Sequence, residues 1–108
     1  MAKLGQPYTS GRWLVRAGSE DDFIARWTAF TRWSSNNEPE AESFVLIRDT
    51  GDPRRFISFG AWDNPEAVTK WRQRPEFARL LGECRALCEE FEPRDYTLAA
   101  TPSIQASE

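Results

Sequence analysis

The spacing of apolar residues changes along the chain, and each change predicts a new element. Between residues 8 and 17 apolar and polar positions alternate, which is typical of a strand. Phe23, Trp27 and Phe30 then recur at helical spacing behind Ser19, a residue suited to capping, and two aspartates suited to a first turn. We therefore expect a strand over residues 8–17, followed by a helix that begins after Ser19 and fades at residues 34–37.

A hairpin is predicted in the middle of the chain. Residues 38–42 are acidic and contain a proline, so we expect a solvated loop there. The apolar run within residues 43–49 predicts a second strand, and residues 55–62 predict a third. Between them, Thr50-Gly-Asp-Pro53 is a turn signal.

The second helical region begins at Asn64-Pro65, because asparagine caps a helix and proline is tolerated at its first position. Pro75 predicts a break or kink near Arg74, or the start of a further helix. A continuous apolar stripe then predicts a helix that Pro93 ends, with a last strand at residues 95–100. The stripe consists of Phe77, Leu80, Leu81, Cys84, Leu87, Cys88 and Phe91.

The resulting order, β-α-β-β-α-β, predicts an α+β fold of the ferredoxin-like class, with a four-stranded antiparallel sheet and helices on one face. Both faces of the predicted sheet are apolar: in the third strand Phe56 and Trp62 alternate with Ile57 and Phe59. One layer of helices covers one face only, and a large bare apolar patch is rare on a monomer. We therefore expect a homodimer that packs sheet against sheet.

Composition places the chain among globular proteins and disfavours some classes of binding partner. Its 108 residues suit a single domain at residues 8–100, with a loose leader at residues 1–7 and a loose tail at residues 101–108. The net charge of −3 disfavours nucleic acid as a partner, and no apolar run approaches the ~20 residues that span a bilayer. The two cysteines give no disulfide scaffold and no secretion leader is visible, so we expect a cytoplasmic location without a membrane partner.

The chain contains no histidine, which removes Ser-His-Asp triads, Cys-His dyads, histidine-ligated zinc and a proximal haem histidine. Cys84 and Cys88 lack further metal ligands and fit the apolar stripe, so we expect no metal and no other cofactor. Aromatic residues make up 13% of the chain, which suits a dense core, a lined cavity or a dimer face.

Two runs of residues form a distinctive pattern. The first is Ser10-Gly-Arg-Trp-Leu-Val-Arg16, which leads into a helix with an acidic start. In the second, residues 56–77, a tryptophan ends the third strand, a polar turn follows, another tryptophan lies on the next helix, and a Pro-x-Phe step comes last. These positions are Trp62, Asp63–Glu66, Trp71 and Pro75–Phe77. The two runs resemble the antibiotic biosynthesis monooxygenase (ABM) superfamily of dimeric α+β barrels, and the resemblance extends over residues 8–100.

The resemblance implies oxygenation, either free of cofactor or dependent on haem, in a pocket between the sheet and the helices. Haem-degrading relatives use an asparagine on the first strand, the tryptophan that ends the third strand, and a histidine on the last helix. Only Trp62 matches here, since Leu81 stands at the histidine position and the first strand has no asparagine. The remaining expectation is a cofactor-independent oxidoreductase, a monooxygenase that oxidises an aromatic or polyketide-like small molecule with dioxygen.

This reaction needs a dry aromatic pocket and groups that stabilise a phenolate or carbanion. We expect the catalytic residues to be Trp62, Asn64 and Tyr96. The residues expected to bind the substrate are Trp27, Trp62, Ser58, Gly60, Arg16, Trp71 and Phe77, with the two tryptophans Trp27 and Trp62 enclosing a planar ring and the small residues leaving room for it.

Each candidate also has a purely structural interpretation. The tryptophans suit a core, Asn64 suits a helix cap, and Tyr96 needs only a partner for its hydroxyl. Ser58 and Gly60 suit close packing, and Arg16 suits a solvated strand end. A non-enzymatic dimer that binds a small ligand, and a structural dimer whose aromatics are all core, therefore remain alternatives. An enclosed cavity beside Trp62 with a polar group on its wall would separate them.

Overall fold

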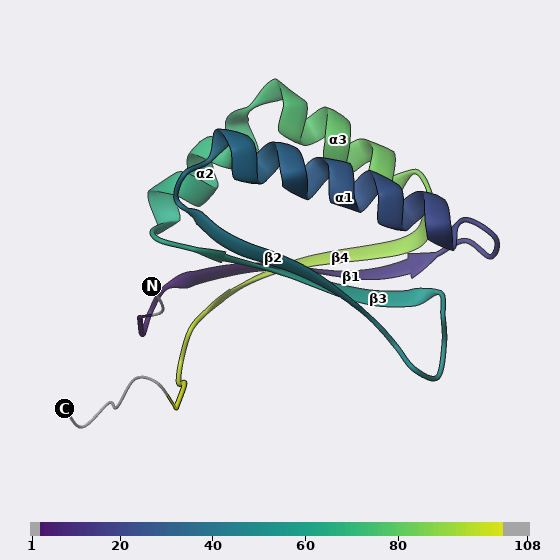
Figure 1. Cartoon of the computed structure of the whole chain (residues 1–108), viewed down its shortest axis with the longest axis horizontal. Helices are drawn as coiled ribbons and strands as arrows, with labels where there is room; N and C mark the ends of the chain where they lie inside the picture. Colours follow the sequence, from purple (N-terminus) through teal and green to yellow (C-terminus); the bar gives the residue numbers. More distant parts are fainter. Residues whose placement is uncertain (1–2, 103–108) are drawn as a thin grey trace.

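In the computed structural model, which describes residues 3–102, seven elements follow one another in nearly the predicted order (Figure 1). They are β1 (Pro7–Val15), α1 (Glu20–Asn37), β2 (Ala41–Arg48), β3 (Arg55–Trp62), α2 (Pro65–Gln73), α3 (Pro75–Arg85) and β4 (Cys88–Thr97). The strands form one antiparallel sheet in the order β2-β3-β1-β4, and all three helices lie on the same side of it. The predicted ferredoxin-like α+β class is confirmed, as is the break between the last two helices.

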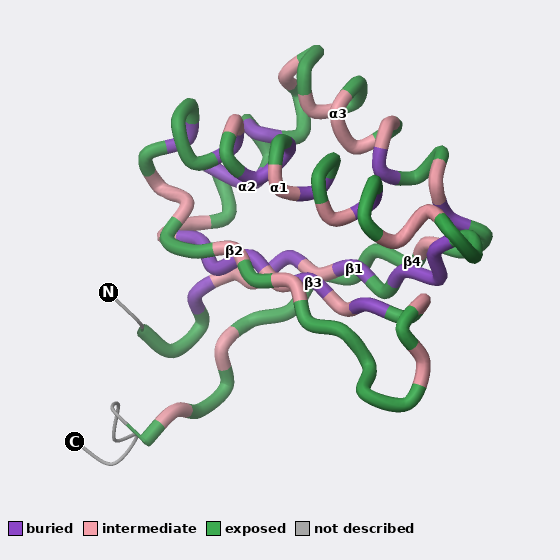
Figure 2. The backbone as a smooth tube through the Cα atoms, turned by 45° about the vertical axis from the view of Figure 1, so that its right-hand side comes forward, coloured by how far each residue is buried: buried purple, intermediate pink, exposed green. Residues whose placement is uncertain are grey.

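The core lies between the helices and the central strands β1 and β3 (Figure 2). Every second residue of these strands points toward the helices and is buried, as the period of two in a strand requires. The helix-facing residues are Thr9, Gly11, Trp13 and Val15 in β1, and Phe56, Ser58, Gly60 and Trp62 in β3. From α1, the predicted Phe23, Trp27 and Phe30 meet them.

Helix α1 begins directly after Ser19, as predicted, and extends to the end of the range over which it was expected to fade. The side chain of Ser19 makes no capping hydrogen bond, and the Glu20 carboxylate instead accepts one of 2.8 Å from the backbone N–H of Gly18. At the other end the helix continues to Asn37, because the hydroxyl of Ser34 donates to the Phe30 carbonyl and the amide of Asn37 donates to the Trp33 carbonyl. These polar side chains, which were expected to weaken the helix, instead donate hydrogen bonds to backbone carbonyls one turn earlier in it.

The expected solvated loop at residues 38–42 is only partly present, because Glu38 is fully buried. Its carboxylate pairs with the guanidinium of Arg74, which lies at the junction of α2 and α3 and also donates to the Asn37 carbonyl. A buried carboxylate requires such a partner. The ion pair therefore ties the end of α1 to the kink between the other two helices.

The end of α3 was predicted wrongly. The helix stops at Arg85, and β4 occupies residues 88–97, so that Phe91 and Pro93 belong to the strand. The apolar stripe crosses the boundary because both elements face the same core. Pro93 is tolerated because β4 is an edge strand with a single neighbour, β1.

Part of the expected leader contacts the sheet. Gln6 is buried, and its side-chain amide donates a hydrogen bond of 3.1 Å to the carbonyl of Trp62. The backbone of Gly5 and Gln6 also bonds to Leu98 beyond the end of β4. The expectations for residues 1–2 and 103–108 lie outside the described residues.

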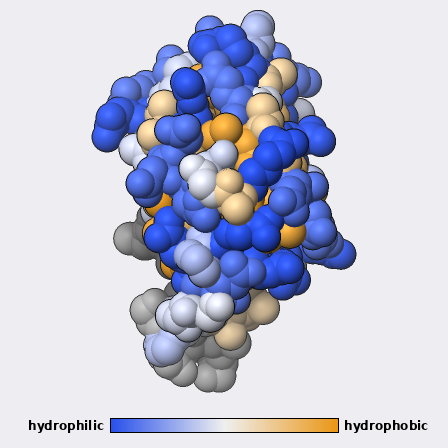
Figure 3. Space-filling view, turned by 90° about the vertical axis from the view of Figure 1, so that its right-hand side faces the viewer, coloured by the Kyte–Doolittle hydropathy of each residue, from blue (hydrophilic) through white to orange (hydrophobic). Residues whose placement is uncertain are grey.

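Among residues 3–102, no helix or strand covers the face of the sheet away from the helices (Figure 1). Its side chains include Leu14, Val45, Ile47, Ile57 and Phe59, and Val45 and Ile47 are half exposed. The end of the molecule that carries the β2–β3 hairpin is mainly hydrophilic, with a few apolar side chains between the charged ones (Figure 3). None of the helices in residues 3–102 is long and apolar enough to cross a membrane.

Candidate functional site

A pocket of about 480 Å³ lies between the helix-facing side of the sheet and the helices. Its floor comes from β1 and β3, one side from β4, and its roof from α1, α2 and α3. Aromatic rings provide most of the apolar wall: Trp13, Trp27, Phe30, Phe44, Trp71, Phe77 and Phe91. The rings of Trp71 and Phe77 meet edge to face at 4.6 Å, and Trp13 stacks on Phe91 at 4.1 Å. The lining is therefore mainly apolar and aromatic, with a few polar groups.

Two glycines in the floor allow these rings to lie close to the backbone. A Cβ at Gly11 would come within 2.8 Å of the Trp13 indole nitrogen, and a Cβ at Gly60 within 2.8 Å of the Phe44 ring. A larger residue at either position would therefore force its neighbours to shift. Gly60 is therefore required by packing, as its structural interpretation held, although it also lines the pocket.

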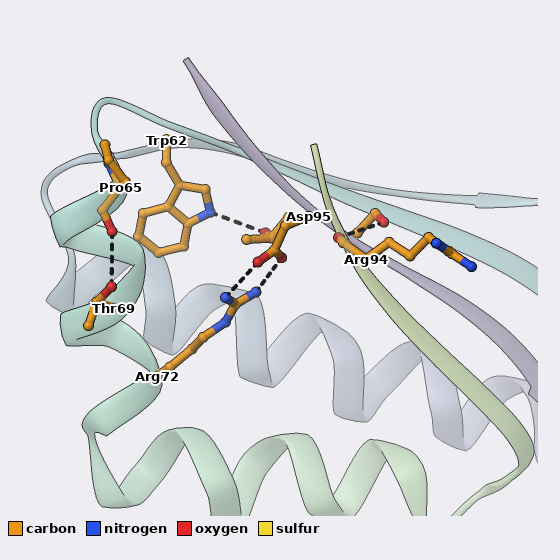
Figure 4. Close-up of polar contacts among 8 residues, drawn as sticks. Trp62, Pro65, Thr69, Arg72, Arg94 and Asp95 are labelled. Carbon is orange, nitrogen blue, oxygen red and sulfur yellow. Dashed lines mark hydrogen bonds and ion pairs between the residues drawn. The ribbon is translucent and has the colours of Figure 1, made fainter. Parts of the chain in front are cut away.

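Three indole N–H groups around the pocket donate to hydroxyl groups. Trp13 donates to Ser58 at 3.0 Å, and Trp62 donates to Thr9 at 3.2 Å (Figure 4). The third donor, Trp71, bonds to the hydroxyl of Ser34 at 2.9 Å, and this hydroxyl in turn donates a hydrogen bond to the Phe30 carbonyl. The hydroxyls of Ser58 and Thr9 donate to no protein acceptor in the described part of the chain. Both residues are buried and line the pocket.

An ion pair between α2 and β4 lies at the rim of the pocket. Arg72 donates two hydrogen bonds, of 2.9 and 2.6 Å, to the two carboxylate oxygens of Asp95 (Figure 4). These bonds hold the pKa of the Asp95 carboxyl below its ordinary value. The bidentate geometry fixes the distance between helix and strand at this side.

Five predicted substrate-binding residues line this pocket together: Trp27, Ser58, Gly60, Trp71 and Phe77. Trp62, predicted to contact the substrate, lies behind the floor instead. It is fully buried, its ring is 4.6 Å from that of Trp71, and its N–H supports Thr9. Trp62 therefore supports residues of the lining and does not line the pocket itself.

The structure places the other three candidates away from the pocket lining. Asn64 caps α2, where its side-chain oxygen accepts a hydrogen bond of 2.8 Å from the Ala67 N–H. Tyr96 is half exposed, because its position in β4 puts it opposite Tyr8, out of phase with the helix-facing residues. Arg16 is exposed beyond β1, and its guanidinium donates to the Ala86 carbonyl.

Sequence reasoning missed Thr9 and the ion pair of Arg72 with Asp95. Thr9 lies two residues before Gly11 and four before Trp13, so strand alternation does place it on their face of the sheet. No sequence signal connects Arg72 to Asp95, because the pair forms between residues that are 23 positions apart.

The two cysteines are buried free thiols. Burial raises the pKa of Cys84 to about 12 and that of Cys88 to about 11, so both are protonated and unreactive near neutrality. Within residues 3–102, no three histidine, cysteine, aspartate or glutamate side chains are grouped so that they could hold a metal ion.

Comparison with known proteins assigns the fold and the family. SnoaB, a cofactor-independent oxygenase from Streptomyces nogalater, shares the fold with a TM-score of 0.82 at 17% identity, over 91% of this chain and 97% of SnoaB. A conserved protein of unknown function from Bacteroides thetaiotaomicron matches at 0.78 and 14% identity, over 89% of this chain and all of that chain. A conserved protein from Methanosarcina mazei matches with a TM-score of 0.78 at 9% identity, over 88% of this chain and 94% of that chain. Among curated proteins no significant match is found.

The sequence itself matches a family model, described as antibiotic biosynthesis monooxygenase, over residues 10–81. The matched region contains most of β1, all of α1, β2, β3 and α2, and the first part of α3, and therefore most of the pocket lining. With two thirds of its residues matched by the model, the chain belongs to the antibiotic biosynthesis monooxygenase family.

Proposed function

We propose that the protein is a cofactor-independent monooxygenase that oxidises a phenolic aromatic or polyketide-like compound with dioxygen in the pocket between sheet and helices. Family membership and the fold shared with SnoaB support this activity. The observation that carries the proposal is the pair of buried hydroxyls, Ser58 and Thr9, in a pocket with aromatic walls.

Each of these hydroxyls accepts an indole N–H and therefore has its own hydrogen left to donate. Donation to a substrate oxygen stabilises negative charge as that charge develops, and such stabilisation is stronger in a site from which water is excluded. The indoles hold both hydroxyls in place before the substrate binds. A phenol whose ring lies between the aromatic walls is thus bound most tightly in its anionic form.

The chemistry follows from that preference. A substrate of the anthrone type loses a proton from its CH₂ carbon to solvent and becomes a carbanion whose charge is shared with the hydrogen-bonded oxygen. One electron passes to dioxygen, and the resulting radicals combine and take up a proton to form a carbon-bound hydroperoxide. Loss of the second C–H proton expels hydroxide, and the two combine to form water. In total CH₂ and O₂ become C=O and H₂O, so the substrate supplies all the electrons.

Oxygen uptake with an anthrone-type phenol tests the proposal. We expect the protein to consume one O₂ for each quinone formed, and Thr9→Val and Ser58→Ala each to lower kcat about 10- to 100-fold. Thr69→Val is the matched control, since Thr69 is exposed on α2 and its hydroxyl bonds only within that helix. Absence of uptake across a broad panel of phenols would refute the enzyme proposal. If the phenols then still bind, the protein is a carrier on the same scaffold.

We propose further that the protein works as a cytoplasmic homodimer through the sheet face opposite the helices. This face carries a patch of apolar side chains of the kind that a monomer rarely exposes. Pairing two such faces back to back would leave the helices and the pocket of each copy free. Sedimentation at micromolar concentration tests this arrangement, and a monomer there would contradict it.

A further inference from the structure

The pocket lining contains three arginines, and two of them are neutralised by carboxylates. Arg72 is paired with Asp95 at 2.6 Å, and Arg94 is paired with Glu92 at 2.7 Å. The third, Arg85, forms no ion pair with a carboxylate in residues 3–102. Among the arginines of the pocket lining, Arg85 is therefore the one whose charge is not compensated by a carboxylate of the described residues.

The position of Arg85 directs this charge toward the aromatic wall. Arg85 is the last residue of α3, and its guanidinium carbon lies 5.4 Å from the centre of the Phe91 ring. Glu83, the nearest carboxylate along the helix, is engaged by Arg26 and Arg79 at 3.5 Å each. The guanidinium thus donates to no acceptor among the described residues, and it lies over an aromatic face beside the pocket.

Direct contacts connect Arg85 to the reacting end of the proposed site. The Phe91 ring under the guanidinium stacks on Trp13, and the Trp13 N–H bonds to the hydroxyl of Ser58. A flat ligand that accepts a hydrogen bond from Ser58 therefore lies along a wall whose far end is Arg85. A guanidinium at that place matches a carboxylate, to which it donates two parallel hydrogen bonds.

We propose that Arg85 binds a carboxylate substituent of the substrate, so that the pocket selects aromatic carboxylates over neutral aromatic compounds. The inference rests on the proposed function only in placing an aromatic ring in this pocket. Arg85 is then a specificity residue that contacts the substrate at a distance from the atoms that react.

Binding of a matched pair of ligands tests the inference. Anthraquinone-2-carboxylate and anthraquinone-2-carboxamide have nearly the same shape and differ in charge, and their binding can be followed by quenching of the fluorescence of Trp13, Trp27 and Trp71. We expect the wild-type protein to bind the carboxylate about tenfold more tightly, and Arg85→Gln to abolish that preference while the affinity for the amide is unchanged. Added salt should also weaken the preference.

Arg79→Gln is the control, because Arg79 is exposed on the same helix and does not line the pocket. It should keep the tenfold preference. Equal affinities in the wild type, a preference that survives Arg85→Gln, or failure of both ligands to bind would overturn the inference. The readout needs no turnover, so a protein that selects the carboxylate but consumes no oxygen would refute the proposed oxygenase activity and leave the carboxylate site standing.

Discussion

The indole N–H of Trp62 donates a hydrogen bond of 3.2 Å to Thr9, so the tryptophan that ends β3 acts on the pocket through a threonine. We predict that Trp62→Phe lowers the free energy of unfolding by about 1–3 kcal/mol, since a buried hydrogen bond and part of a buried ring are lost. Affinity for a planar aromatic ligand should fall less than in Thr9→Val. Urea unfolding and fluorescence titration measure both effects. Weaker binding in Trp62→Phe than in Thr9→Val would place Trp62 in direct contact with the ligand.

Substitution of Asn64 should change the stability of the protein without changing its activity. Asn64→Ala removes the cap of α2 and should lower the free energy of unfolding by about 1 kcal/mol. Because the side chain does not line the pocket, kcat for oxygen uptake should stay within twofold of the wild-type value. Asn64→Ser, which keeps a capping oxygen, is the control and should restore stability. A large loss of kcat in the alanine variant at unchanged folding would restore Asn64 as a catalytic residue.

The ion pair between Arg72 and Asp95 should make stability depend on pH. The pKa of Asp95 is lowered in the folded state, so the pair stabilises the protein above the unfolded pKa of about 4 and loses its effect as pH falls through the folded value. The side chains are exposed, which limits the contribution to about 1 kcal/mol or less. Wild type and Asp95→Asn should therefore differ in Tm at pH 7 and converge near pH 2. A constant difference over this range would contradict the assignment.

A charge on the open sheet face should prevent the proposed dimer. Ile47 is half exposed on that face, so Ile47→Glu costs the single subunit little. We expect it to sediment as a monomer at concentrations where the wild type is a dimer. Ala29→Glu, on an exposed position of α1, should leave the wild-type state unchanged. The outcome that argues against this interface is an Ile47→Glu protein that still dimerises.

The buried thiols should be inert in the folded protein. With pKa values raised to about 12 for Cys84 and about 11 for Cys88, almost no thiolate is present at pH 8. A disulfide reagent such as DTNB should label neither residue in the native protein and both in guanidinium chloride. Rapid labelling of either thiol without denaturant would show that this part of the core opens readily.

The fold was predictable because its signals are local. The strand over residues 55–62 matches the prediction at both ends, and the next helix begins at Pro65 as predicted, since alternation, capping and proline act within a few positions. The boundary between α3 and β4 was not predictable in this way. Phe91 fits the helical spacing of the stripe, and only its pairing with Trp13 across the sheet places it in a strand.

The site was predictable in its aromatic lining and not in its polar groups. Trp27, Trp71 and Phe77 lie on the core faces of helices, so periodicity finds them. The hydroxyl of Thr9 gains its role from Trp62, 53 positions away, and the carboxylate of Glu38 is buried because Arg74 reaches it from 36 positions away. Such partnerships depend on tertiary structure, which spacing along a single chain does not encode.

Pro93 in the middle of β4 has a consequence for how copies of the protein can associate. A proline fits an edge strand only where its nitrogen faces outward, so the outer rim of the sheet lacks one of the backbone donors that an added strand would need. Charged neighbours such as Glu92 and Arg94 reinforce this. Lateral growth into extended ribbons is thereby blocked, and the aromatic-rich chain is protected from fibre formation along this margin.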